Sequence, residues 1–194
     1  MDNWQAVWYS RAHNGGSHAI QVENAMKPKR KINIAAEIKA IENCIDALAD
    51  SGNHMVIAVG SAIREENFSY TVGLAERGWP EIIITCIDQD TARGVINGIV
   101  AFYKNSATFP TAGAIFPPGF PMPFEAIEVE AHDAPEHLTM ASQRLTRLGK
   151  DPGDLRVLQL VYSDTVGRFQ WEEGFDQNWR QVLLGNPPLP HRPQ

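Results

Sequence analysis

Asp164 and Arg168 form the polar pair in this sequence that is best suited to chemistry. Both lie in the segment Ser163-Asp-Thr-Val-Gly-Arg-Phe-Gln-Trp171, which reads as a tight turn with Gly167 at positive φ, followed by a short strand. A turn that holds a carboxylate beside a guanidinium offers a general base and a clamp for an anion. A structural role also fits, because an Asp at a turn caps backbone N–H groups and an Arg four residues later pairs with it. The sequence leaves both interpretations open.

Three further candidate side chains, Tyr70, Thr71 and Glu81, come from one stretch that reads as two strands. The first strand is Phe68-Ser-Tyr-Thr-Val-Gly-Leu74, and the second follows in Trp79-Pro-Glu-Ile-Ile-Ile-Thr-Cys-Ile87. Alternation puts Tyr70 on an apolar face and Thr71 on a face of small residues, where a helix, a backbone or a ligand can approach closely. If Glu81 and Tyr70 lie near the Asp164 turn, one cleft holds all of these groups.

The histidines and cysteines do not predict a metal site. His13 and His18 are five residues apart, as are His132 and His137, which is not the same-face spacing of a zinc hydrolase. Cys44 and Cys86 each stand alone, in a helical and a strand pattern respectively, and are predicted to be buried free thiols.

The sequence also lacks the common catalytic motifs. It contains no G-x-S-x-G nucleophile elbow, no G-x-x-x-x-G-K-[ST] phosphate loop and no G-x-G-x-x-G dinucleotide motif. No cofactor is predicted, and the sequence assigns no reaction.

Composition describes an ordinary globular chain. Its 194 residues are 43% hydrophobic and 21% charged, and no apolar run approaches the roughly 20 residues that span a bilayer. The N-terminus shows no secretory signal, so the expected location is the cytoplasm. A net charge of -6 argues against non-specific nucleic-acid binding, which depends on neutralised phosphates.

We expect three segments: an arm over residues 1–31, one domain over 32–185, and a loose proline-rich tail over 186–194. The arm has a net charge of +3, with the basic run Lys27-Pro-Lys-Arg-Lys31 and aromatic residues at 4, 8 and 9. The basic run fits a solvated linker or a contact with an acidic partner. The aromatic residues fit docking on the core or on a second subunit.

The domain is predicted to be α+β, with a mainly antiparallel sheet of five or six strands covered by helices. Strands are expected at 54–60, 68–74, 82–87, 125–130 and 155–162, with a short sixth at 168–171. Helices are expected from 34 with Asn33 as N-cap, from 90 with Asp90 as cap, from 133 with an Asp133–Glu136 capping box, and within 172–184. The first helix carries an apolar face of Ile34, Ile38, Ile41, Ile45 and Leu48. The apolar positions of the second helix are Val95, Ile96, Ile99, Val100, Phe102 and Tyr103.

A proline-rich connection over 105–123 interrupts this pattern. It contains Phe109-Pro-Thr-Ala-Gly and Ile115-Phe-Pro-Pro-Gly-Phe-Pro-Met-Pro-Phe124, and its prolines exclude a helix interior or a central strand. Long connections of this kind are lids, binding surfaces or wraps over a core. Its phenylalanines favour either a wrap or a lid that docks a partner.

These motifs together resemble a bacterial family known as domain of unknown function 4262. The resemblance rests on Phe68 to Leu74, on Pro80-Glu81 before an apolar strand, and on Gln159-Leu-Val-Tyr-Ser-Asp164 followed by Gly167-Arg168-Phe169, Trp171-Glu172 and Gly174. It covers about residues 34–185. Ser163 and Gln170 stand where that family usually has prolines. A weaker similarity, carried by Tyr-Thr-Val-Gly-Leu and Pro-Glu alone, connects the chain to suppressor-of-fused-like immunity domains.

The resemblance implies no established activity, so several functional hypotheses remain. The leading one is a cytoplasmic module that binds a protein partner, of the immunity or counter-defence kind. The alternative is an enzyme or nucleotide binder with a cleft near the Asp164–Arg168 turn, and homodimer assembly through the arm and the loop is a third. The candidate ligand or partner residues are Tyr70, Thr71, Glu81, Asp164, Arg168 and Trp171.

Overall fold

The computed structural model describes residues 5–8, 33–106, 108–116, 122–130 and 134–187. Its core is a seven-stranded sheet with the order β1-β2-β3-β4-β7-β6-β5. The strands are β1 (Gln5–Trp8), β2 (Met55–Gly60), β3 (Phe68–Val72), β4 (Glu81–Thr85), β5 (Ile115–Phe116), β6 (Phe124–Glu128) and β7 (Val157–Tyr162). Every neighbouring pair is antiparallel except β4 and β7. The predicted α+β class with a mainly antiparallel sheet is therefore confirmed.

The two outermost strands come from segments whose sequence gave no strand signal. β1 belongs to the expected arm and pairs with β2, whereas β5 lies in the proline-rich connection and pairs with β6. The rest of the arm, Asp133 of the expected capping box and residues 188–194 of the tail lie outside the described residues.

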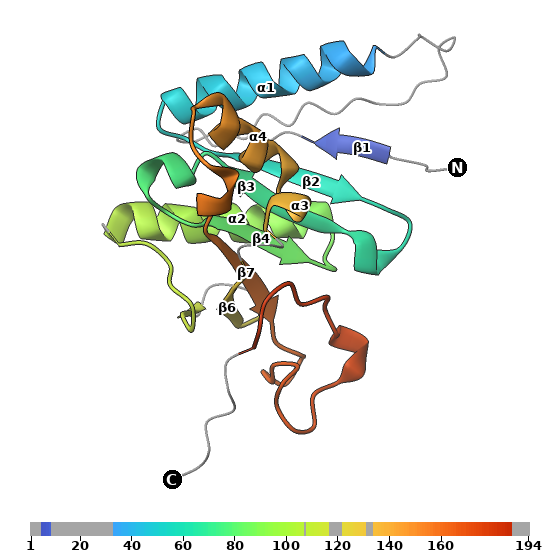
Figure 1. The fold of residues 1–194 in the computed structure, drawn as a ribbon. Helices are drawn as coiled ribbons and strands as arrows, with labels where there is room; N and C mark the ends of the chain where they lie inside the picture. The colour runs from blue at the N-terminus through green and yellow to red at the C-terminus, as the bar shows by residue number, and fades with distance from the viewer. Residues whose placement is uncertain (1–4, 9–32, 107, 117–121, 131–133, 188–194) are drawn as a thin grey trace.

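Helices cover both faces of the sheet (Figure 1). They are α1 (Ile34–Asp50), α2 (Gln89–Ser106), α3 (Ala134–His137) and α4 (Thr139–Arg147), with 3-10 turns η1 (Arg64–Glu66), η2 (Ala75–Arg77), η3 (Pro152–Asp154) and η4 (Gln177–Trp179). Apolar side chains of α2 pack on one face, together with those of Ile82, Ile84 and Leu160. Side chains of α1, α3 and α4 pack on the other face, and Tyr70 and Val72 lie there as the strand alternation predicts.

The helix α1 begins as predicted but is buried only along its second half. The side chain of Asn33 accepts a hydrogen bond from the Ala36 N–H, as an N-cap does. Ile45 and Leu48 are buried, whereas Ile34 and Ile38 are exposed. Cys44 is also exposed, so its predicted burial is wrong. The helix of 17 residues is about 26 Å long, and described neighbours cover only the part next to β2.

A buried arginine ties three elements together on this face. The guanidinium of Arg144 in α4 donates hydrogen bonds to Asp46 and Asp50 of α1 and to Glu76 of η2. Because these carboxylates surround it, the pKa of Arg144 is raised well above its ordinary value. This cluster fixes α1 and α4 against the turn that follows β3.

Three local expectations about capping and the C-terminal segment are wrong. Asp88, not Asp90, caps α2, because its side chain accepts the Thr91 N–H. The expected strand at 168–171 and the expected helix at 172–184 do not form, and only the short turn η4 is helical there. Buried polar side chains from the sheet bind this segment in an irregular conformation and replace the hydrogen bonds of regular structure.

Candidate functional site

The Glu81 carboxylate is fully buried at the start of β4 and accepts four hydrogen bonds. Its Oε1 atom accepts the backbone N–H groups of residues 73, 74 and 75 at 2.9, 2.9 and 3.0 Å. Its Oε2 atom accepts the Thr71 hydroxyl, which in turn accepts the Ile82 N–H at 2.8 Å. We call this group the Thr71–Glu81 clamp. It satisfies the orphan N–H groups of the turn between β3 and η2.

The environment of Glu81 acts on its proton affinity in two opposite ways. Burial raises the pKa of the carboxyl, because an ionised carboxylate loses its hydration, and the hydrogen bonds from Thr71 and from the three N–H groups oppose that shift. The described hydrogen-bond donors around the Glu81 carboxylate come from β3 and from the turn that follows it. The motif residues Thr71 and Glu81 therefore hold the β3–β4 connection.

Tyr70 lies in the core on the face of α4. Its hydroxyl accepts the Met140 N–H at 3.4 Å, and its ring stacks on Phe68 with centroids 6.1 Å apart. Burial raises the pKa of Tyr70 to about 12, so this phenol is neutral at physiological pH. It positions α4 on the sheet.

Asp164 binds its own turn. Its Oδ1 atom accepts the N–H groups of Val166 and Arg168 at 3.0 and 2.9 Å, and its Oδ2 atom accepts that of Asp176 at 3.2 Å. Burial by itself would raise the pKa of Asp164, but these N–H donors lower it below its ordinary value. The carboxylate is therefore held ionised by backbone donors, as in an Asx turn.

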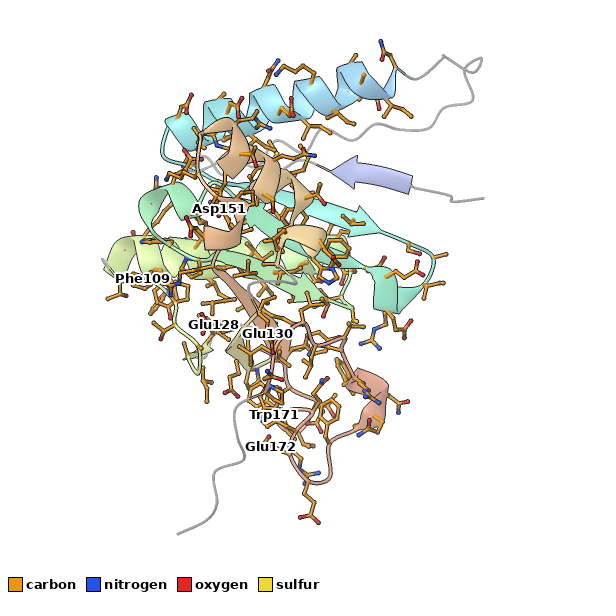
Figure 2. The ribbon with its side chains drawn as sticks, viewed as in Figure 1. Phe109, Glu128, Glu130, Asp151, Trp171 and Glu172 are labelled. Carbon is orange, nitrogen blue, oxygen red and sulfur yellow. The ribbon has the colours of Figure 1, made fainter. Side chains whose placement is uncertain are left out.

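Arg168 and Trp171 complete this loop without closing a cleft over Asp164. The Arg168 guanidinium donates to the Gly174 carbonyl at 2.7 Å. The Trp171 ring stacks on Phe169, with centroids 5.2 Å apart and planes at 10°. Figure 2 shows Trp171 beside Glu172 in the loop that follows β7.

The structure does not bring the candidate residues into one site. In the parallel pair, Glu81 of β4 lies opposite Val157 at the start of β7, whereas Asp164 follows the end of β7. The strand β7 therefore separates the Thr71–Glu81 clamp from the Asp164 turn by roughly 16 Å. The cleft that the enzyme hypothesis requires, with Tyr70, Glu81, Asp164 and Arg168 together, does not form.

Sequence reasoning missed a polar cluster at the far end of β4 and β7. Arg64 of η1 donates to the Cys86 carbonyl at 2.9 Å, to the Asn178 carbonyl at 3.0 Å and to the Tyr162 hydroxyl at 2.7 Å. Tyr162 donates to the same Cys86 carbonyl at 3.0 Å. Cys86 is at φ 59, a left-handed conformation that costs a non-glycine residue about 1–2 kcal/mol. The cluster joins η1, β4, β7 and η4, and only Tyr162 carried a sequence signal, as part of the motif.

Beside these satisfied polar groups, the structure presents exposed apolar side chains around the end of α2 and around β5. Phe102, Phe109 and Ile115 are 52%, 42% and 63% exposed. Phe102 was expected to face inward, but it lies at the margin of the apolar stripe of α2. Figure 2 places Phe109 beside the C-terminal end of α2. We call these three residues the α2–β5 surface.

A series of aromatic ring contacts, called the aromatic chain below, connects this surface to the buried core. The Phe102 ring meets Tyr103 edge to face at 5.3 Å, and Tyr103 meets the buried Phe116 at 5.9 Å. Phe116 and Phe124 are buried against α2, so the proline-rich connection wraps the core at these two positions. Phe109, in the same connection, faces outward.

Metal-ligand groups and membrane-spanning helices are both absent from the part of the chain that the structure describes. Within the described ranges, no three His, Cys, Asp or Glu side chains are grouped as metal ligands would be. No described helix is long and apolar enough to cross a membrane. His13, His18 and His132, considered above, lie outside the described residues.

The fold and its contacts define an α+β protein in which most polar motif residues stabilise the connections of an open sheet. The chain belongs to the family described as "Domain of unknown function (DUF4262)", whose model matches residues 47–176, about two thirds of the chain. No curated protein and no solved structure matches it. The weaker similarity to suppressor-of-fused-like domains thus has no support in these comparisons.

Proposed function

We propose that this protein is a protein-binding module and that its partner docks on the α2–β5 surface. The observation that carries the proposal is that β5, the outermost strand of the sheet, presents the exposed Ile115, while Phe109 in the same connection is also exposed. Single exposed apolar residues are common, but three within fourteen residues of sequence next to a sheet edge are typical of an interaction site.

The geometry favours an extended segment of the partner. No described strand pairs with the outer edge of β5. The N–H and C=O groups of an edge strand offer hydrogen bonds to an added strand, and pockets or exposed apolar side chains then select its residues. The partner segment is therefore an extended peptide with apolar side chains at alternate positions, which contact Ile115 and the aromatic residues.

The aromatic chain beneath the surface makes it suitable for binding. Phe102 is held against Tyr103, and Tyr103 against Phe116, so ordering these rings on binding costs little conformational entropy. Rigid aromatic anchors commonly supply most of the energy of a protein interface.

The polar motif residues support a binding role because their carboxylates have structural roles in the fold. The Thr71–Glu81 clamp and the Asp164 turn use their carboxylates to hold backbone N–H groups. A general base must be within reach of a substrate proton, and both carboxylates are occupied by the fold. An immunity or counter-defence role remains part of the proposal, in which the partner is a toxic or defence protein that binding inhibits.

The proposal is tested by affinity capture from a bacterial lysate, with quantification of each captured protein. The test variant is Phe109→Ser/Ile115→Ser, and the matched control is Val166→Ser, because Val166 is 69% exposed on the distant Asp164 turn. We expect one partner to bind the wild type and the control equally, and the double variant at least roughly tenfold less tightly. Circular dichroism verifies that all three proteins are folded.

Two outcomes would overturn the proposal. Capture that does not distinguish the double variant from the control would place binding elsewhere. A homodimer in light scattering that dissociates in the double variant would assign the surface to self-association.

A further inference from the structure

A group of basic and amide side chains meets at the C-terminal end of α1, next to the turn η2 that follows β3. Arg77 comes from η2, Asn53 and His54 precede β2, and Asn97 and Lys104 come from α2. The two α2 residues are seven apart, so they lie on the same face of that helix, two turns from each other.

Contacts with residues 52–54 place these side chains along the loop between α1 and β2. The Arg77 guanidinium lies against Gly52, where an added Cβ atom would be 2.5 Å from its Nη2 atom. The neighbouring Asn53 accepts a hydrogen bond from Lys104 Nζ at 3.4 Å. His54 Nε2 and Asn97 Oδ1 are 3.0 Å apart. The loop between α1 and β2 thus joins a guanidinium, an ammonium group and an imidazole.

The two cations in this group are not neutralised by the fold. Neither Arg77 nor Lys104 forms an ion pair with a carboxylate among the described residues. Burial and the charge of Arg77 both lower the pKa of Lys104, so the two positive charges repel each other. A bound anion would remove this repulsion.

His54 provides the second, independent observation. The residue is 2% exposed, and its Nδ1 atom is buried without a hydrogen-bond partner in the described structure. Buried polar atoms are nearly always paired, so an orphaned imidazole nitrogen beside two cations indicates a missing ligand. Burial, with the charges of Lys104 and Arg77, lowers the pKa of His54 to about 4.

We propose that Arg77, Lys104 and His54 form a binding site for a phosphate-type oxyanion. Arg77 supplies a planar fork of donors and Lys104 a point charge, which are the two usual ways in which proteins bind phosphate. His54 Nδ1 accepts the hydroxyl of a hydrogen phosphate, or donates to a dianion once the imidazole is protonated. Asn53 and Asn97 orient Lys104 and His54.

A purely structural role explains only part of this arrangement. A cation beside the C-terminus of α1 is favourable because the helix dipole is negative there, and this accounts for Arg77. The same argument accounts for Lys104, which lies in the last turn of α2, but it does not account for the orphaned nitrogen of His54. The proposal is independent of the protein-binding function, because no residue of the α2–β5 surface takes part.

Isothermal titration of the full chain with inorganic phosphate tests the site, with methyl phosphate as a probe for phosphate monoesters. The test variants are Arg77→Gln and Lys104→Gln. The matched controls are Arg180→Gln and Lys150→Gln, two exposed cations elsewhere on the molecule. We expect saturable binding by the wild type and both controls, and a loss of at least tenfold in affinity in each test variant.

A second readout reports on His54. Binding of the anion should raise the pKa of this imidazole, so the protein should take up a fraction of a proton at pH 6, and NMR of the ring should show the change. Saturable binding that the controls lose equally would indicate general charge screening and overturn the site. Absence of saturable binding in the folded wild type would also overturn it.

Discussion

Glu81 is a buried carboxylate whose charge is balanced by backbone N–H groups and one hydroxyl. The Thr71–Glu81 clamp joins the end of β3, the turn η2 and the start of β4 through one side chain. A carboxylate suits this position because it only accepts hydrogen bonds, and the turn offers only donors. The glutamate of the Pro-Glu motif is thus explained by the hydrogen-bond donors that its carboxylate accepts.

Replacing Glu81 should separate its acceptor function from its charge. Glu81→Ala leaves three buried N–H groups unpaired, and we expect it to lower the free energy of unfolding by about 3 kcal/mol or more. Glu81→Gln keeps Oε1 as an acceptor and should cost only about 1 kcal/mol. Urea unfolding measures both values, and equal losses in the two variants would show that the clamp depends on charge alone.

His54 should make stability depend on pH. Its pKa is lowered from 6.5 in the unfolded chain to about 4 in the fold, so the unfolded state binds the proton more tightly. Its contribution is therefore fully present above pH 6.5 and is lost as the pH falls toward 4. Between pH 7 and 4.5, in a buffer without oxyanions, this histidine should cost the wild type about 2 kcal/mol.

The control for this pH effect is His54→Gln, whose amide can still reach Asn97. Urea midpoints of the wild type and the variant at the two pH values isolate the contribution of the imidazole. Parallel pH profiles for the two proteins would contradict the assignment.

At the scale of elements, the irregular segment after η4 is the part whose position depends most on specific contacts. Gln159 of β7 is fully buried, donates to the Val182 carbonyl at 2.7 Å and accepts the Leu184 N–H at 2.7 Å. The segment then forms a bridge between Gly185 and Val129. It thereby covers the part of the sheet that α3 and α4 do not.

Gly185 should be required for this docking. A Cβ atom there would lie 2.0 Å from the Glu128 carbonyl oxygen, so Gly185→Ala forces two backbones apart and should cost about 2 kcal/mol. Hydrogen exchange should show faster exchange at residues 182–185 while β3 stays protected. The matched control is Gly94→Ala within α2, where the space is open and the change should stabilise the helix by about 1 kcal/mol. Unchanged exchange in Gly185→Ala would contradict the close packing.

At the scale of the whole molecule, the sheet distributes the polar groups over separate places. The Thr71–Glu81 clamp and the cluster around His54 lie at one end of the central strands, because Met55 of β2 pairs with Val72 of β3. The Asp164 turn and the Arg64 cluster lie at the other end. The strand β5, which contributes Ile115 to the α2–β5 surface, lies at an outer edge of the sheet. The proposed anion site therefore shares its end of the sheet with the Thr71–Glu81 clamp, whereas the Asp164 turn lies at the opposite end.

Local patterns in the sequence were enough to predict the elements that have a regular period. Alternation in 68–72, the apolar run in 82–85 and the 3–4 spacing in α1 and α2 follow from the periods of strands and helices, and these elements formed as predicted. The turn role of Asp164 was one of two interpretations available from its position, since an Asp beside a glycine turn binds its own backbone.

Which residues contact one another depends on the strand order and on the packing of the helices. The strand order places Glu81 and Asp164 at opposite ends, joins Arg77 to Lys104 and His54, and leaves Phe102, Ile38 and Cys44 exposed although their spacing suggested burial. A helical period gives the direction of a side chain but not the length of the neighbour that covers it. Contacts between residues far apart in sequence depend on strand pairing, which local patterns do not specify.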